Sequence, residues 1–309
     1  MIGSDRTDRH AYLLMIHESS MVLQNLLQLL DCSWNDIYIH IDKKAKGVDA
    51  KQIESLVKQS NVYFVKRHRI YWGDNSMLLA ELELLRAAVK RSYCYYHLLS
   101  GADLPIKTKE EIYDFFHVHS GKEFIHFGTE SYQNAIQSRY QVYHFFMKGL
   151  GRKRNRKLWN LAETYSLAIQ RRLHIDRRKE ISYAGGAQWF SITHSFVCYI
   201  IQQYKRYAYV WRFTQITDEL WLQTMCMDSE YRKRLYIPGF VDDYRACVRF
   251  IDWKRGNPYV FHEQDIEELL QSECMFARKF DETIDKGIIQ KLFRILSDKK
   301  DEICKSCER

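Results

Sequence analysis

Apolar residues in the first part of the chain alternate between continuous runs and helically spaced segments. The continuous run at residues 10–17 is typical of a strand buried on both faces of a parallel sheet, and residues 36–42 and 62–65 are predicted to form the second and third strands. Residues 21–30 and 48–59 lie between these runs and repeat apolar side chains at helical spacing. This order predicts an α/β protein that begins with one half of a doubly wound sheet.

The same alternation continues to about residue 127. Helices are predicted over residues 76–91 and 109–119, and strands over residues 93–99 and 123–127. Nucleotides bind beyond the carboxyl ends of the strands in sheets of this kind. Residues 10–127 are therefore predicted to form a Rossmann-like, nucleotide-binding half.

Polar residues stand directly at three of the predicted strand ends. His17 follows the first strand, Asp42 ends the second, and Ser100 and Asp103 lie in the turn after residues 93–99. His17 and Asp42 are candidates for the nucleotide site, and Ser100 and Asp103 are polar residues presented at a strand end. For His17 a second interpretation stays open, because a histidine next to an apolar run is often a core residue with satisfied hydrogen bonds.

Two glycines open the stretch at residues 185–190, where the backbone can turn tightly or approach another segment closely. A strand is predicted to follow over residues 188–193 and a helix over residues 195–209. Further on, Asp218 and Glu219 stand at the start of another helical segment. Glu219 is the candidate general base, although a carboxylate at this place also interacts favourably with the helix dipole.

Composition narrows the class of protein and its partners. With 309 residues, 46% of them apolar and 28% charged, the chain is expected to be a soluble globular protein. Its net charge of +8 favours an anionic partner such as a nucleotide-sugar phosphate, a membrane surface or a nucleic acid. We find no signal peptide and no apolar run of the roughly 18–20 residues that span a membrane. We therefore expect a cytoplasmic protein whose scattered cysteines are reduced.

Residues 148–179 are rich in basic side chains and also repeat apolar residues at helical spacing. This pattern fits a solvated helix face or a surface that meets anionic lipid head groups. Nucleic-acid binding is a third interpretation, weakened because no recognition motif accompanies the charge. The basic residues are Lys148, Arg152, Lys153, Arg154, Arg156, Lys157, Arg171, Arg172, Arg177, Arg178 and Lys179.

Seven short motifs occur in an order that resembles one known family, the core-2/I-branching β-1,6-N-acetylglucosaminyltransferases (glycosyltransferase family 14). This family also includes the peptide O-xylosyltransferases. The resemblance covers roughly residues 10–285. The motifs are Ala11–Leu14 with His17, Ile39–Lys44, Trp72–Gly73, Leu98–Ile106, Gly186–Phe190, Asp218–Glu219 and Phe276–Asp281.

The resemblance implies a single GT-A-like catalytic domain over residues 10–285, with the acceptor and catalytic half at 128–285 and a helix and charged tail at 286–309. It also implies inverting transfer from a UDP-sugar without a metal or other cofactor. The family neutralises the diphosphate with an arginine and a lysine near the C-terminus. Lys279 matches the lysine, and Arg255 is assigned to the arginine.

The resemblance assigns further roles to residues that the patterns had singled out. Glu219 would be the catalytic base. His17, Asp42, Tyr71 and Trp72, together with Arg255 and Lys279, would bind the nucleotide-sugar, and Ser100, Asp103, Arg139, Gln188 and Trp189 would line the acceptor and donor-sugar pocket. For Trp189, packing in the core is the competing interpretation.

These observations predict a bacterial, inverting and metal-independent glycosyltransferase. Its donor is expected to be UDP-GlcNAc, and its product a β-linkage to a hydroxyl of a glycan in cell-surface polysaccharide or glycoconjugate synthesis. The acceptor is expected to be lipid-linked at the inner membrane face, with peripheral contact to anionic lipid and no contact with nucleic acid. UDP-xylose or another UDP-sugar as donor, and a non-catalytic protein that binds a nucleotide or glycan, are the alternatives.

Overall fold

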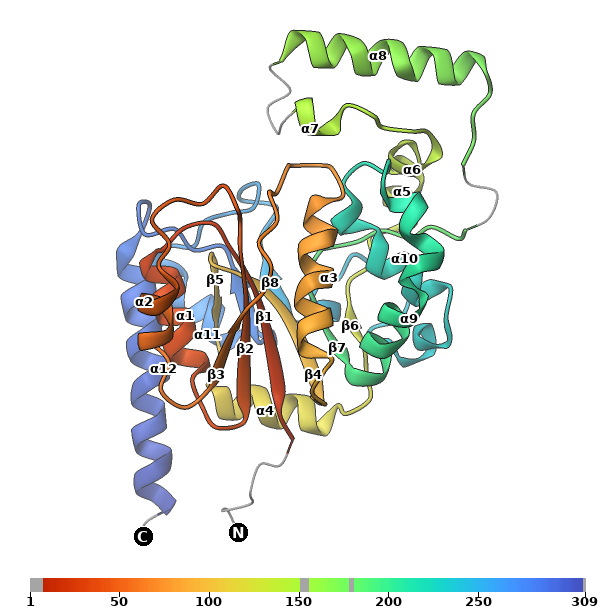
Figure 1. Ribbon diagram of the computed structural model, residues 1–309. Coiled ribbons are helices and arrows are strands. Elements are labelled where there is room, and N and C mark those ends of the chain that lie inside the picture. The colour runs from red at the N-terminus through yellow and green to blue at the C-terminus, as the bar shows by residue number, and fades with distance from the viewer. Residues whose placement is uncertain (1–7, 151–155, 178–180, 308–309) are drawn as a thin grey trace.

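A six-stranded sheet forms the centre of the molecule (Figure 1). The computed structural model describes residues 8–150, 156–177 and 181–307, and side chains up to residue 298. Strand β1 pairs in parallel with β2 and β4, and β2 in parallel with β3, whereas β7 runs antiparallel to β4 and β6. In sheet order the strands are β3 (Asn61–Phe64), β2 (Asn35–Ile41), β1 (His10–Ile16), β4 (Tyr95–Ser100), β7 (Phe190–Thr193) and β6 (Phe124–Ile125).

A second, three-stranded sheet joins the C-terminal part of the chain to the turn after β4. Strand β9 (Phe276–Arg278) lies between β5 (Asp103–Pro105), which is antiparallel to it, and β8 (Arg249–Ile251), which is parallel. The backbone N–H of Phe280 also donates to the carbonyl of Ala102 at 2.9 Å. The basic residues at 278 and 279 are therefore held beside the turn at residues 100–103.

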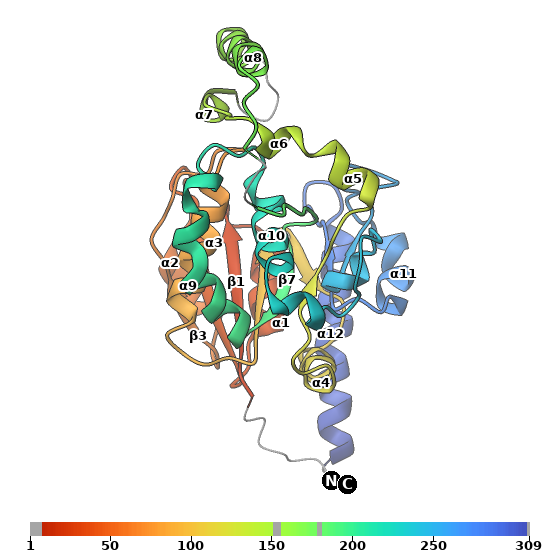
Figure 2. The ribbon, with the colours of Figure 1, turned by 90° about the vertical axis from the view of Figure 1, so that its right-hand side faces the viewer.

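Helices cover both faces of the large sheet (Figures 1 and 2). Helices α3 and α9 lie on one face, and α1, which packs against α12, lies on the other. The helices are α1 (Met21–Leu30), α2 (Ala50–Ser55), α3 (Ser76–Ala88), α4 (Lys109–Val118), α5 (Glu130–Ala135), α6 (Ser138–Gln141), α7 (Met147–Leu150), α8 (Lys157–Arg172), α9 (His194–Trp211), α10 (Trp221–Met227), α11 (Ile266–Gln271) and α12 (Lys286–Cys307).

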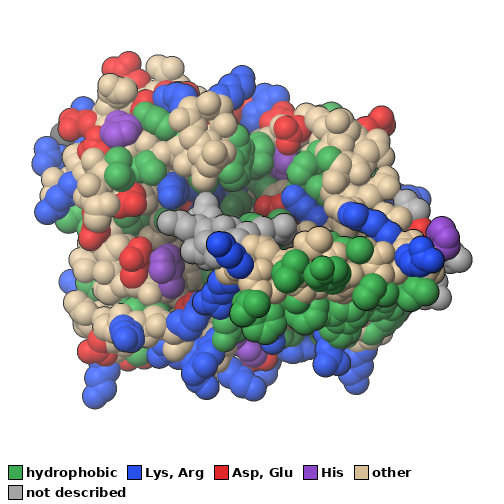
Figure 3. Space-filling view, turned by 90° about the horizontal axis from the view of Figure 1, so that it is seen from above, with side chains coloured by type: hydrophobic (Ala, Val, Ile, Leu, Met, Phe, Trp, Pro, Cys, Tyr) green, Lys and Arg blue, Asp and Glu red, His purple; other side chains and the backbone are tan. Residues whose placement is uncertain are grey.

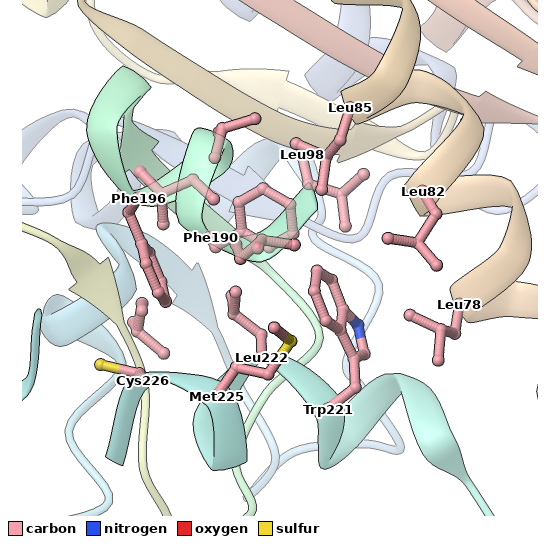
Figure 4. Packing of buried hydrophobic residues seen from close by; sticks show 14 of the residues in the cluster. Leu78, Leu82, Leu85, Leu98, Phe190, Phe196, Trp221, Leu222, Met225 and Cys226 are labelled. Carbon is pink, nitrogen blue, oxygen red and sulfur yellow. The ribbon is translucent and has the colours of Figure 1, made fainter. Parts of the chain in front are cut away.

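The core is split by the sheet into two apolar clusters, because successive side chains of a strand point to opposite faces. Leu13 of β1 belongs to the cluster under α3 and α9, and the next residue, Leu14, belongs to the cluster under α1. Figure 4 shows part of the first cluster, in which Phe190 packs edge-to-face on Trp221 with ring centroids 6.3 Å apart. This packing anchors α10 and the turn before it to the sheet.

The predicted α/β class with a mixed central sheet is confirmed. The predicted strand at 188–193 is shorter in the structure and begins at Phe190. The residues before it are held by side chains instead of a neighbouring strand, as when Gln223 Nε2 donates to the carbonyl of Ala187 at 2.7 Å. The strand predicted at 123–127 is likewise limited to β6.

Candidate active site

The carboxyl ends of β1, β2 and β4 meet at one edge of the sheet, because β1 pairs with both of the others. His17 follows β1, Asp42 follows β2, and Ser100 ends β4, so the structure brings these three predicted residues to the same edge. The His17 imidazole is exposed and lies 3.7 Å from the carboxylate of Glu18. It is therefore not a core histidine.

Asp42 ties the loop after β2 to the loop before α3. Its Oδ1 accepts hydrogen bonds from the backbone N–H groups of Lys44 at 2.8 Å and Ile70 at 3.3 Å. The ammonium of Lys44 lies 5.1 Å from the centre of the Tyr71 ring, and the side chain of Trp72 is exposed. Asp42, Tyr71 and Trp72 thus belong to one connected loop structure, and their role in binding uridine stays a prediction.

Glu219 is positioned by the same loop. It ends a 3-10 turn at Thr217–Glu219, which follows Ile216 in the left-handed region at φ 51°. The N–H of Ile216 donates to the carbonyl of Gly73 at 2.8 Å, and Gly73 has φ 81°, a conformation that favours glycine. The loop that carries Trp72 therefore fixes the turn that carries Glu219.

The carboxylate of Glu219 has one oxygen engaged. Its Oε2 accepts from Arg139 Nη1 at 2.7 Å and from the hydroxyl of Tyr132 at 3.1 Å, whereas Oε1 accepts no hydrogen bond from the described residues. The Glu219 side chain keeps 37% of its surface exposed. Two residues that the sequence analysis singled out, Glu219 and Arg139, are therefore in direct contact, and Oε1 of Glu219 remains to accept a proton.

Two further acids near Glu219, Asp218 and Glu81, have raised pKa values. Burial, and then the charge of Glu219, raise the pKa of Asp218 to about 7. Glu81 is fully buried, and this burial raises its pKa well above the ordinary range. Glu81 accepts hydrogen bonds from Gln188 Nε2 and Trp221 Nε1, both at 2.6 Å. The Gln188 amide is therefore held by a buried acid, and its predicted contact with the sugars stays a prediction.

Arg278 of the second sheet contacts both an aromatic ring, that of Trp189, and a carboxylate, that of Asp103. The guanidinium of Arg278 lies 4.0 Å from the centre of the Trp189 ring system and 3.3 Å from Asp103 Oδ1. Oδ2 of Asp103, a buried residue, accepts from the N–H of Ser100 at 2.6 Å. Asp103 and Trp189 thus orient the guanidinium of Arg278. Trp189 can therefore both pack against the protein and contribute to a ligand site.

Lys279 follows Arg278 and is held through its backbone. Its N–H donates to the carbonyl of Tyr259 at 3.2 Å, and its carbonyl accepts from the N–H of Phe261 at 3.1 Å. In the part of the chain that the structure describes, no carboxylate lies within 4.0 Å of its ammonium. Lys279 is therefore available for an anionic ligand.

The structure argues against the prediction for Arg255. Its guanidinium is already bound by the carboxylates of Asp252, of Asp265 at 2.9 Å and of Glu268 at 2.7 Å. A diphosphate would have to displace these three acids or lie beside them, which like charge opposes. Arg278, which the sequence analysis did not single out, is a better partner for Lys279. Its only signal in the sequence is its place next to that lysine.

A family model described as Core-2/I-Branching enzyme matches residues 10–274. The chain belongs to this family. Among relatives of this chain, xylosyltransferase oxt of Drosophila pseudoobscura pseudoobscura is 23% identical over 308 residues, and xylosyltransferase 2 of Canis lupus familiaris is 24% identical over 310. The matches cover 92% and 91% of this chain but only 33% of each relative, so the chain spans about a third of their length.

A solved structure is also similar to this chain. Mouse xyloside xylosyltransferase 1, in its apo form, matches 87% of this chain and 96% of its own with 10% identity and a TM-score of 0.37. Within the described residues of the chain, no three His, Cys, Asp or Glu side chains are grouped so that they could hold a metal ion. No helix in the same residues is both long and apolar enough to cross a membrane.

Close contacts surround both glycines of the central stretch. The N–H of Gly186 donates to the carbonyl of Glu219 at 2.9 Å, which joins this stretch to the turn. A Cβ at Gly186 would overlap the backbone carbonyl of His126, so only glycine allows these two backbones to approach. A Cβ at Gly185 would overlap the end of the Ile136 side chain, which can move aside.

We expect Gly186→Ala to lower the free energy of unfolding by about 1–3 kcal/mol, because the rigid backbone at His126 must shift to accept the methyl group. Urea denaturation followed by circular dichroism measures the change. Gly101→Ala is the matched control. A Cβ there would meet only the side chain of Ile16, at an ordinary 3.5 Å, so the expected cost is below about 0.5 kcal/mol. Equal costs for the two variants would contradict the argument.

We expect the contribution of Asp218 to the free energy of unfolding to fall as the pH rises from about 4 to 7, and to stay low above that. The raised pKa of Asp218, about 7 against an ordinary 3.8, means that the folded state binds more protons at this residue in the interval. The free energy of unfolding of the wild type should therefore fall relative to that of Asp218→Asn, as measured by urea denaturation at pH 5, 6, 7 and 8. Other buried groups act equally in both proteins: burial raises the pKa values of Glu81 and Glu123, which adds to the slope, and lowers those of His10 and His40, which opposes it. A difference between the two proteins that does not change with pH would refute this origin.

Proposed function

We propose that this chain is an inverting glycosyltransferase that transfers a sugar from a UDP-sugar to a hydroxyl of a glycan. The observation that carries the proposal is the carboxylate of Glu219, held by Arg139 and Tyr132 at the edge where β1, β2 and β4 end. Membership of the core-2/I-branching enzyme family supports it, as does the position of nucleotide sites in sheets of this type.

The proposed base, Glu219, and the proposed diphosphate-binding cations lie at the two ends of the short segment from Gly186 to Trp189. Gly186 contacts the backbone of Glu219, and Trp189, three residues later, stacks on Arg278. Three residues span at most about 11 Å. A UDP-sugar between these ends would present its anomeric carbon toward Glu219 and its diphosphate toward Arg278 and Lys279.

The chemistry follows from these positions. Glu219 takes the proton of the acceptor hydroxyl while that oxygen bonds to the anomeric carbon from the face opposite UDP. The bond between the anomeric carbon and the phosphate oxygen breaks, and its electron pair goes to the diphosphate. Lys279 and Arg278 stabilise the charge that develops there. A single displacement inverts the anomeric configuration, so an α-linked donor gives a β-linked product.

We infer that the donor is UDP-GlcNAc, as the resemblance to the N-acetylglucosaminyltransferases implied. UDP-xylose is the second candidate, which the xylosyltransferases among the relatives favour. Release of UDP from UDP-GlcNAc, UDP-xylose, UDP-glucose and UDP-galactose, measured with the same chain, distinguishes them. Turnover of UDP-xylose alone would overturn the GlcNAc assignment, and turnover of none would favour a non-catalytic binding protein.

The proposed transfer is independent of metal ions and uses a lipid-linked glycan as its acceptor, in the cytoplasm at the inner membrane face. UDP release in the presence of EDTA tests the first point, with added Mn²⁺ as the control. Activity that disappears with EDTA and returns with Mn²⁺ would contradict the assignment of the diphosphate to basic side chains.

A further inference from the structure

Helix α8 has an inverted distribution of polar and apolar side chains. A helix of a globular protein normally turns its apolar side to the core and its polar side to water. In α8 the buried residues are Glu163 and Gln170, each only 6% exposed. The large apolar residues face outward and recur at a spacing of three or four, which places them on one side of the helix. They are Leu158, Leu161, Tyr165, Ile169 and, just after the helix, Leu173, all between 53% and 82% exposed.

Hydrogen bonds fix the helix in this orientation. Nδ1 of the buried His144 and Oε1 of Glu163 are 2.7 Å apart. The Gln170 side chain accepts from the N–H of Tyr143 at 2.7 Å and donates to the carbonyl of the same residue at 2.8 Å. The polar side of α8 is therefore bound to the segment before α7. The helix cannot rotate its apolar side inward without breaking these buried bonds, which would be costly.

The apolar side of α8 faces away from the rest of the molecule. The helix stands beyond the edge where the parallel strands end, apart from the layers that cover the sheet (Figures 1 and 2). Seen from above, a hydrophobic band runs along it, with basic side chains at its margins (Figure 3). On its inner side, α8 borders a cleft of about 640 Å³ whose lining includes Ser138, next to Arg139.

The charges of α8 identify what fits this apolar side. Glu163 is the only acid of the helix, and it is buried, whereas the exposed charges on the helix and at its start are basic. A second copy of the chain would bring two such basic surfaces together, which like-charge repulsion opposes. An anionic lipid surface fits both the apolar side of α8 and its basic residues, because apolar side chains enter the boundary of the acyl region while basic ones meet the head groups. The basic residues are Arg156, Lys157, Arg171 and Arg172.

We propose that α8 is an interfacial helix that binds the chain to an anionic lipid surface, with its apolar side in the membrane boundary and the edge that carries Glu219 turned toward it. Among the basic residues of segment 148–179, Arg152, Lys153, Arg154, Arg178 and Lys179 lie outside the described residues and are not needed for this argument. The proposal rests on the surface of α8 and not on catalysis, so lipid binding is measured without any sugar donor.

The test is flotation of the full chain with vesicles of phosphatidylcholine alone or with phosphatidylglycerol added to about a third. We expect the wild type to float with the anionic vesicles and to stay behind with the neutral ones. Leu161→Ser with Ile169→Ser should lower the partition coefficient onto the anionic vesicles at least tenfold. Lys157→Gln with Arg172→Gln should lower it by roughly fivefold for each charge removed.

The matched control is Val118→Ser with Ile284→Ser, which removes two apolar side chains that are also exposed, at 77% and 56%, but lie outside α8. It should float like the wild type, and circular dichroism should show that every variant is folded. Failure of the wild type to bind anionic vesicles, or equal binding by the α8 variants, would overturn the proposal. Concentration-dependent dimerisation that the Leu161→Ser and Ile169→Ser changes abolish would assign this side to a second copy instead.

Discussion

Replacement of Glu219 by glutamine is expected to lower the rate of sugar transfer by about a hundred- to ten-thousand-fold, the usual contribution of a general base. Glutamine has the shape of glutamate and its amide oxygen can still accept from Arg139 and Tyr132, whose contacts with Glu219 are 2.7 and 3.1 Å. The loss should therefore come from proton transfer and not from a collapsed turn. UDP release in the presence of acceptor measures the rate.

Binding and a second acid separate this role from a structural one. Calorimetry should give an affinity for UDP that differs from that of the wild type by less than about threefold, because Glu219 is not assigned to the nucleotide. Glu130→Gln, at an exposed acid in the first turn of α5, is the control and should transfer at the wild-type rate. Transfer at full rate by Glu219→Gln would exclude this residue as the base.

The fold was predictable wherever a strand is long and buried on both faces. Strands β1 and β2 have seven residues each, all of them buried, and their pattern of apolar residues alone indicated a parallel sheet. The second sheet was not predicted, because β5, β8 and β9 have three residues each and a run that short has no readable period. This sheet matters for function, since it holds Arg278 and Lys279 beside the turn after β4.

Within the site, the sequence identified individual candidate residues but not the residues that they contact. Asp42 was recognisable as a carboxylate at a strand end. The contact between Arg139 and Glu219, by contrast, joins residues 80 positions apart and exists only through the fold. For Arg255 likewise, the partners that argue against its predicted role are not revealed by the sequence. Its charge is visible in the sequence, but Asp265 and Glu268, which bind it, follow 10 and 13 residues later on a separate turn and helix.

Lys279→Met should lower the rate of transfer by roughly a hundred- to thousandfold and weaken UDP binding, because a cation aimed at the developing charge of the diphosphate is lost. Lys279→Arg keeps the positive charge and should recover part of both. Lys254→Met removes an exposed lysine from the loop after β8 and should change neither. Isothermal titration with UDP and the UDP-release assay measure the two effects.

The same measurements on Arg255→Met decide between the two candidates for the second cation. If the three carboxylates around Arg255 hold it in place as the structure indicates, the substitution leaves Asp252, Asp265 and Glu268 to repel one another. The chain should then lose stability to urea while its affinity for UDP stays within about twofold. Arg278→Met should instead weaken UDP binding as Lys279→Met does. A large loss of UDP affinity in Arg255→Met together with none in Arg278→Met would restore Arg255 to the diphosphate site, and it would mean that the ligand displaces the carboxylates.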